Sequence, residues 1–178
     1  MTQVNDNGLT ILGETIRPGD SKEVNFDVAN LHTSSPVHIP VIIERSKKPG
    51  PTVFFTAGIH GDEVNGVEIV RQLIAKGINK PKCGTIICMP VINIFGFLNL
   101  KREFPDGRDL NRVFPGSPSG SLAGRVAHKL IHDIIPHVDL IIDGGYSGHQ
   151  PTTVIDLTDD EPVLLREGKG DVDWLVRH

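Results

Sequence analysis

The sequence has 178 residues, of which 38% are apolar and 22% are charged. This composition is that of an ordinary globular protein, and the length is enough for one domain with a buried core. Acidic residues number 22 and basic residues 18, giving a net charge of −4 with no basic block, which argues against a nucleic-acid partner. The N-terminus lacks a signal-peptide pattern and no apolar run reaches membrane-spanning length, so we expect a cytoplasmic location and no membrane partner.

The first half of the chain alternates strand and turn patterns before one helical stretch. Short alternating runs in residues 10–12, 24–28 and 37–44 predict an antiparallel strand group that leads into the main sheet. Residues 51–55 and 84–92 are apolar runs typical of buried strands, and residues 64–74 repeat apolar side chains at helical spacing. Strand, helix and strand in this order predict a crossover unit whose two strands pair in parallel.

The segment between the first of these strands and its helix carries the main candidate site. His60 and Glu63 lie at the carboxyl end of the strand, the edge of an α/β sheet at which ligands bind. An imidazole and a carboxylate three residues apart can converge on one divalent cation, and both suit zinc. The alternative is a polar loop whose His60 and Glu63 are merely solvated.

A long polar segment, residues 101–116, follows the second strand. Loops of this length without regular structure are usually functional or disordered. Its side chains Arg102, Arg108 and Arg112 offer planar guanidinium groups that can bind a substrate carboxylate. The alternative is a solvated surface loop.

Residues 121–135 show the periodicity of an amphipathic helix. His128 and His132 are four residues apart in it, a spacing at which two imidazoles can bind a metal together. Because the helix offers no third ligand, the interpretation as surface residues is preferred. Residues 138–143 then predict a third buried strand.

Several of these motifs, in this order, resemble the succinylglutamate desuccinylase/aspartoacylase family, which has the zinc carboxypeptidase fold. The likeness extends over about residues 10–143, and the matching segments are residues 58–63, Asn93, Arg102, 107–116 and 138–143. The resemblance implies His60 and Glu63 as zinc ligands and Arg102, Asn111 and Arg112 as binders of the substrate's carboxylate. It also implies hydrolysis of an N-acyl amino acid or a related amide, a deacylase reaction with zinc as cofactor.

The family pattern breaks after the third strand. The family has Asp-Leu-His there, and its histidine is the third zinc ligand, but this chain has Gly145 at that position. The family's general-base glutamate comes further along than any residue of this sequence, so turnover is expected to be impaired and no catalytic base is assigned. His149, on a Gly-rich turn, is the candidate to replace the missing metal ligand; the alternative is an exposed turn histidine.

The tail, residues 138–174, resembles a second family, namely the C-terminal end of the YrdC/Sua5/YciO domain, whose members bind nucleotides or RNA. Thr152, Thr153 and Arg166 match positions that line the nucleotide site in that family. The two likenesses meet at residues 138–143, so we infer a junction there, as in a chimera. Residues 1–143 are expected to form the deacylase-like part, and residues 144–178 to add strands that complete the same domain.

Three functional hypotheses remain open on the sequence alone. The first is a zinc-dependent amidohydrolase acting on a small carboxylate substrate, the second a YrdC-like nucleotide- or RNA-binding remnant, and the third a chimera with neither activity. The expected fold is α/β, with a mixed, mainly parallel sheet flanked by helices, an N-terminal antiparallel strand group and a truncated zinc-carboxypeptidase-like architecture. Exposed sheet edges favour self-association into a homo-oligomer.

Overall fold

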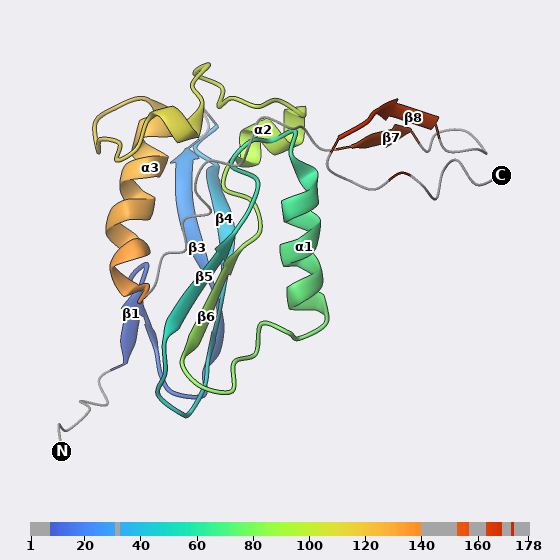
Figure 1. Ribbon diagram of the computed structural model, residues 1–178. Coiled ribbons are helices and arrows are strands. Elements are labelled where there is room, and N and C mark those ends of the chain that lie inside the picture. The colour runs from blue at the N-terminus through green and yellow to red at the C-terminus, as the bar shows by residue number, and fades with distance from the viewer. Residues whose placement is uncertain (1–7, 31–32, 140–152, 157–162, 169–171, 173–178) are drawn as a thin grey trace. The chain divides into compact units, whose positions relative to one another are not determined.

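The computed structural model describes residues 8–30, 33–139, 153–156, 163–168 and 172. The chain divides into two compact units, Met1–Ile141 and Ile142–His178. Among the described residues, the first unit holds all the helices and a four-stranded sheet, and the second holds a two-stranded sheet (Figure 1).

The main sheet has the strand order β3-β4-β6-β5. Its members are β3 (Ser21–Asn30), β4 (Pro36–Arg45), β5 (Thr52–Thr56) and β6 (Thr85–Met89). β5 and β6 pair in parallel, with Thr52 opposite Thr85 and Thr56 opposite Met89, and α1 (Val64–Ala75) connects them. The predicted strand–helix–strand unit is therefore confirmed.

The expectation of a mainly parallel sheet is wrong for the described strands. β3 pairs with β4 and β4 with β6 in antiparallel fashion, so only the β5–β6 pair is parallel. The reason is the position of β4, which inserts between β3 and β6 and brings the antiparallel N-terminal strands into the same sheet. The sheet is mixed, as predicted, but its antiparallel part is the larger.

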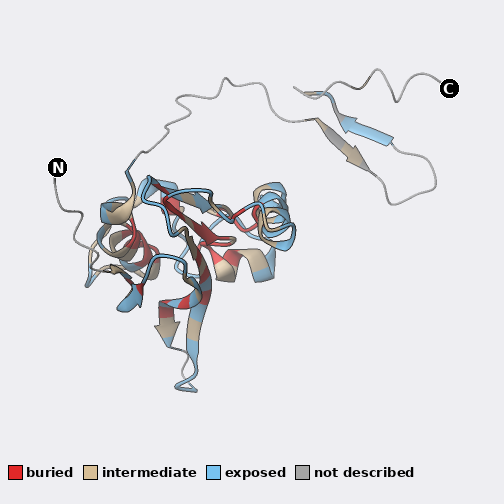
Figure 2. Cartoon of the chain, turned by 90° about the horizontal axis from the view of Figure 1, so that it is seen from below, coloured by how far each residue is buried: buried red, intermediate tan, exposed pale blue. Residues whose placement is uncertain are grey.

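Helices lie on both faces of this sheet, α1 on one and α3 (Leu122–Asp133) on the other (Figure 1). The face toward α3 forms the core, because every second residue of β3 and β4 is apolar and points the same way. Phe26 lies opposite Ile39 and Val24 opposite Val41 across the two strands. Figure 2 colours the buried residues red. The core includes Phe26, Ile39, Val41, Ile43, Ile87, Met89, Val126 and Leu130.

Both long helices have residues suited to ending or starting a helix. Ser121 accepts a hydrogen bond from the Gly124 N–H at 3.2 Å and so caps α3. Gly77 follows Lys76, the C-cap residue of α1, and has φ of +66°, the left-handed conformation with which helices commonly end. Sequence periodicity did not predict α2 (Ile94–Asn99) or the 3-10 helices η1 (Leu110–Arg112) and η2 (Ile135–His137), since all three are shorter than two helical turns.

The remaining strands form two small hairpins. β1 (Leu9–Ile11) pairs with β2 (Glu14–Ile16), and β7 (Val154–Asp156) pairs with β8 (Val163–Arg166) in the second unit. The predicted strand at residues 138–143 lies mostly outside the described residues. That residues 144–178 complete the domain begun by residues 1–143 stays a prediction. None of the described helices is both long and apolar enough to cross a membrane.

Candidate metal and carboxylate site

His60 and Glu63 lie in the turn between β5 and α1, at the carboxyl end of the parallel strand pair. Gly58 starts this turn with φ of +62°, and a Cβ there would come within 3.2 Å of Val67 and Val91 side-chain atoms. The turn is thus pressed against the α1 helix and the end of β6. As a result the His60 ring is buried, with a relative exposure of 6%.

A second segment, which follows α2, is held against this turn by hydrogen bonds. The Gly61 N–H donates to the Lys101 carbonyl at 3.0 Å. The fully buried Asn93 caps α2 through the Gly96 N–H at 2.8 Å, and its amide donates to the Arg102 carbonyl at 3.1 Å. These contacts fix the backbone of Arg102 beside His60.

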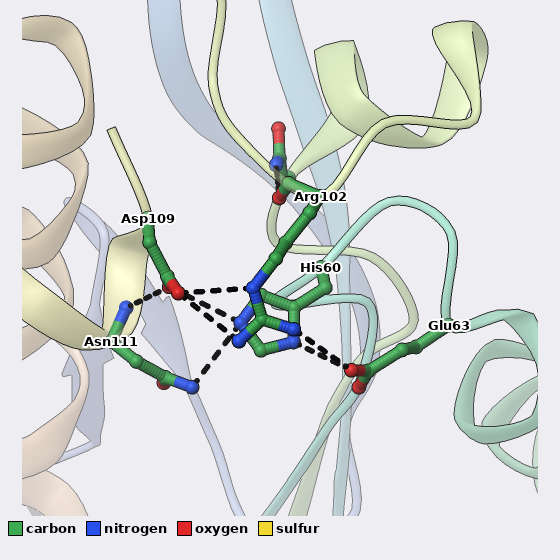
Figure 3. A network of polar contacts seen from close by, with 6 residues as sticks. His60, Glu63, Arg102, Asp109 and Asn111 are labelled. Atoms are coloured by element: carbon green, nitrogen blue, oxygen red, sulfur yellow. Dashed lines mark hydrogen bonds and ion pairs between the residues drawn. The ribbon is translucent and has the colours of Figure 1, made fainter. Parts of the chain in front are cut away.

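Five polar side chains from these segments form one network (Figure 3). The Nδ1 of His60 is 2.8 Å from Glu63 Oε1, and its Nε2 is 3.1 Å from Asp109 Oδ1. Arg102 bridges the two carboxylates, at 3.1 Å from Asp109 Oδ2 and 3.4 Å from Glu63 Oε1. The amide of Asn111 is 3.3 Å from His60 Nε2. The imidazole is therefore flanked by a carboxylate at each nitrogen.

Asp109 is the residue of this site that sequence reasoning missed. Burial alone would raise the pKa of its carboxyl, but hydrogen bonds from the Asn111 backbone, His60 and Arg102 outweigh burial and hold the pKa below its usual value. An ionised carboxylate can only accept hydrogen bonds. Asp109 is thus placed to accept a hydrogen bond from a protonated His60 Nε2, and in that neutral tautomer the Nδ1 lone pair would face Glu63. The signal was its position in the segment 107–116, which was read only for its arginines and asparagine.

The predicted carboxylate-binding residues are only partly brought together. Arg102 and Asn111 belong to the network, whereas Arg112, the last residue of η1, is exposed, and its side chain makes no hydrogen bond or ion pair with the described residues. Arg108 is also outside the network; its backbone N–H bonds to Asp106. His149, the predicted third metal ligand, and Thr152, from the tail motif, lie outside the described residues.

The donor pair fits a zinc ion in chemistry but supplies two protein ligands. Two donors on one tetrahedral zinc at ordinary bond lengths are roughly 3.4 Å apart, slightly more than the 2.8 Å between His60 Nδ1 and Glu63 Oε1. The Glu63 side chain is 63% exposed, so it is free to make this small adjustment. Within the described part of the chain, no cluster of three His, Cys, Asp or Glu side chains suited to a metal occurs.

The family model of the succinylglutamate desuccinylase/aspartoacylase catalytic domain matches residues 49–144, more than half of the chain. The chain therefore belongs to the succinylglutamate desuccinylase/aspartoacylase family. It is 33% identical over 108 residues to an N-alpha-acetyl-L-2,4-diaminobutyric acid deacetylase of Halomonas elongata, with 60% of this chain and 31% of the deacetylase covered. The chain thus spans about a third of the length of that relative.

A solved structure gives the same result for the fold. An aspartoacylase family protein from Mesorhizobium loti superposes with a TM-score of 0.60 at 33% identity, covering 68% of this chain and 38% of the other. The α/β architecture of the family is therefore present over part of the chain. It includes β5, α1 and β6, on which His60 and Glu63 are placed.

A short segment has a different relative. Over 35 residues the chain is 77% identical to the uncharacterized protein YciO of Escherichia coli, which is 20% of this chain and 17% of YciO. Both family resemblances noted in the sequence are thus confirmed. A chain that joins parts of two families is consistent with the inferred chimera.

Proposed function

We propose that the first unit is the metal- and carboxylate-binding part of a zinc-dependent deacylase that acts on N-acyl amino acids. The observation that carries the proposal is the arrangement around His60, with Glu63 at Nδ1 and Asp109 at Nε2. A ring-nitrogen lone pair and a carboxylate oxygen that face each other need a cation between them, either a proton or a metal ion. Family membership makes zinc the preferred ion, and a deacetylase among the relatives supports the reaction class.

Each residue of the network has a distinct proposed part. His60 and Glu63 would hold zinc, which when bound polarises an amide carbonyl and lowers the pKa of its bound water. Asp109 fixes the tautomer and the orientation of the His60 ring, as carboxylates commonly do for metal-binding histidines. Arg102 and Asn111 line the same place and are proposed to bind the substrate's carboxylate.

Arg102 must change partners to do so. It now pairs with Glu63 and Asp109, and its guanidinium is 43% exposed, so these bonds compete with water and are weak. A substrate carboxylate would offer a bidentate contact that is geometrically better. Arg112, exposed and without a described partner, is proposed as the second cation for the same group.

A catalytic zinc site normally has three protein ligands and one water, and His60 and Glu63 supply two of the ligands. The site therefore needs a third protein ligand besides His60 and Glu63, and His149 is proposed for that position. Without an assigned base, hydrolysis is expected to be slow. Slow turnover would distinguish this chain from an enzyme of the family that has the third zinc ligand and the general base.

The test is zinc-dependent release of free amine from N-acetyl-L-2,4-diaminobutyrate and from N-succinylglutamate. We expect slow release that requires added zinc and disappears both with a chelator and in the Glu63→Gln variant. Release that is equal with and without zinc would contradict the proposal. No release at all, from a chain that still binds zinc through His60, would leave a metal-binding domain without the deacylase activity and would likewise contradict it.

The main alternative is a non-catalytic chimera, which the YciO-like segment favours. One form of this alternative is a tail that binds nucleotides or RNA, as the second family resemblance implies. The matched segment is only 17% of YciO, so the match leaves most of that protein uncovered. Titration with ATP and with a short RNA tests it, and micromolar binding of either would favour it over the deacylase proposal.

If Asp109 orients His60 for metal binding, removal of its charge should lower the zinc affinity. Asp109→Asn keeps the size of the side chain but removes the charge that orients His60, so zinc affinity should fall about tenfold or more. Isothermal titration with zinc measures this, and Asp62→Asn, an exposed neighbour of the site, is the matched control. Equal affinities of the two variants would show that Asp109 does not support the metal.

A further inference from the structure

A second histidine pair lies on α3, in a different part of the fold from His60. His128 and His132 are four residues apart in Leu122–Asp133, so their side chains lie on one face of the helix. Their ring centroids are 4.1 Å apart and the rings are tilted by 46°. His132 is exposed and His128 is half-buried, so the pair can be reached from solvent.

Neither ring is committed to another group. His60 has contacts at both ring nitrogens, whereas no hydrogen bond or ion pair joins the ring of His128 or of His132 to any described residue. No described residue therefore occupies a ring nitrogen of either histidine. A metal ion can bind an imidazole pair of this kind without first breaking a contact.

The helix holds the two rings in place. Val126, Ala127 and Leu130 on the opposite side of α3 are buried in the core, and Ser121 caps the helix. Because the backbone is fixed, binding an ion through both rings loses little more conformational entropy than binding it through one ring. The second imidazole then acts at a high effective concentration.

The surroundings of the pair allow a cation. His132 lines one hollow of about 340 Å³ and His128 lines another of about 290 Å³, and Asp27 lines both. The nearby cation Lys129 has its ammonium 3.9 Å from Asp27 and 5.0 Å over the Phe26 ring. Its charge is thus partly balanced. In the described part of the chain no third side-chain ligand completes a cluster, so water would fill the other positions.

We propose that His128 and His132 together form a surface chelate site for a divalent transition metal, separate from the His60 site. Two imidazole nitrogens suit nickel, copper and zinc, and the general order of affinity places copper and nickel ahead of or near zinc. The inference rests on α3 alone and holds whether or not the chain is a deacylase. It has a practical consequence, because zinc measured in the purified chain would be shared between two sites.

The experiment is titration calorimetry with Ni²⁺ on the full chain in a Glu63→Gln background, which weakens the first site without touching α3. His128→Ala and His132→Ala should each reduce Ni²⁺ affinity by about tenfold or more, since either change converts a chelate into a single imidazole. His38→Ala, an exposed histidine of β4, is the matched control and should leave the affinity unchanged.

Two single variants are used so that a loss of affinity can be told apart from misfolding. His132 is exposed, so its replacement should not disturb the core, and far-ultraviolet circular dichroism checks that α3 is intact in both variants. A loss of about tenfold in both supports the chelate. A smaller loss in either folded variant, or an equal loss in His38→Ala, would overturn it.

Discussion

Replacing His60 by alanine should lower the zinc affinity of the chain by about a hundredfold or more. The imidazole is the nitrogen donor of the proposed pair, and the second donor, Glu63, is 2.8 Å from it. With one exposed carboxylate left, an ion would be held by a single flexible side chain. The change also removes the ring that lies between the Glu63 and Asp109 carboxylates.

Competition of the chain with a coloured zinc chelator measures this affinity. The variants are best made in a His132→Ala background, so that the proposed pair on α3 does not contribute. Glu63→Gln removes the other donor from an exposed position and should weaken binding in the same direction without affecting the core. His38→Ala serves as the control. Zinc affinity that survives in both His60→Ala and Glu63→Gln would rule out this pair as the ligands.

The second large effect is expected at Gly61, the residue next to His60. An alanine Cβ there would overlap the carbonyl group of Gly96 and the backbone nitrogen of Phe97, both in α2. These are backbone atoms that cannot rotate away, so α2 must shift. Forcing extra volume into a packed site costs about 1–3 kcal/mol in the free energy of unfolding. Zinc affinity should fall as well, because the Gly61–Lys101 hydrogen bond holds the Arg102 segment to the turn.

Urea unfolding of Gly61→Ala and Gly66→Ala checks this expectation. Gly66 is the matched control: it lies in α1, and an added Cβ would meet only Ala57, with its nearest atom at 3.1 Å. Alanine is the better helix former by about 0.5–1 kcal/mol, which offsets that contact. Equal stability of the two variants would contradict the close approach of the turn to α2.

The local structure around the site was predictable because it depends on short stretches of sequence. The apolar run before Gly58 and the helical spacing after Glu63 define β5 and α1, and these two elements alone place His60 at the end of a strand. The capped helix α3 was equally predictable. What the sequence could not determine is the order of strands, since the insertion of β4 between β3 and β6 depends on contacts between distant segments.

The same limit explains why Asp109 was missed. It lies 49 residues from His60, and nothing in the local pattern separates it from Asp106, which instead accepts a hydrogen bond from the Ala123 N–H. Which carboxylate reaches the ring depends on the path of residues 101–112. The residue of this segment that contacts His60 could therefore be identified only from the fold.

The most direct test of the account is to observe the two nitrogens of the His60 ring by proton–nitrogen correlation spectroscopy during a zinc titration. The His60 signals are identified by their loss in His60→Ala. We predict that Nδ1 becomes zinc-bound while Nε2 keeps its proton for Asp109. A His60 ring that is unaffected by zinc, or that binds it through Nε2, would contradict the proposed metal site.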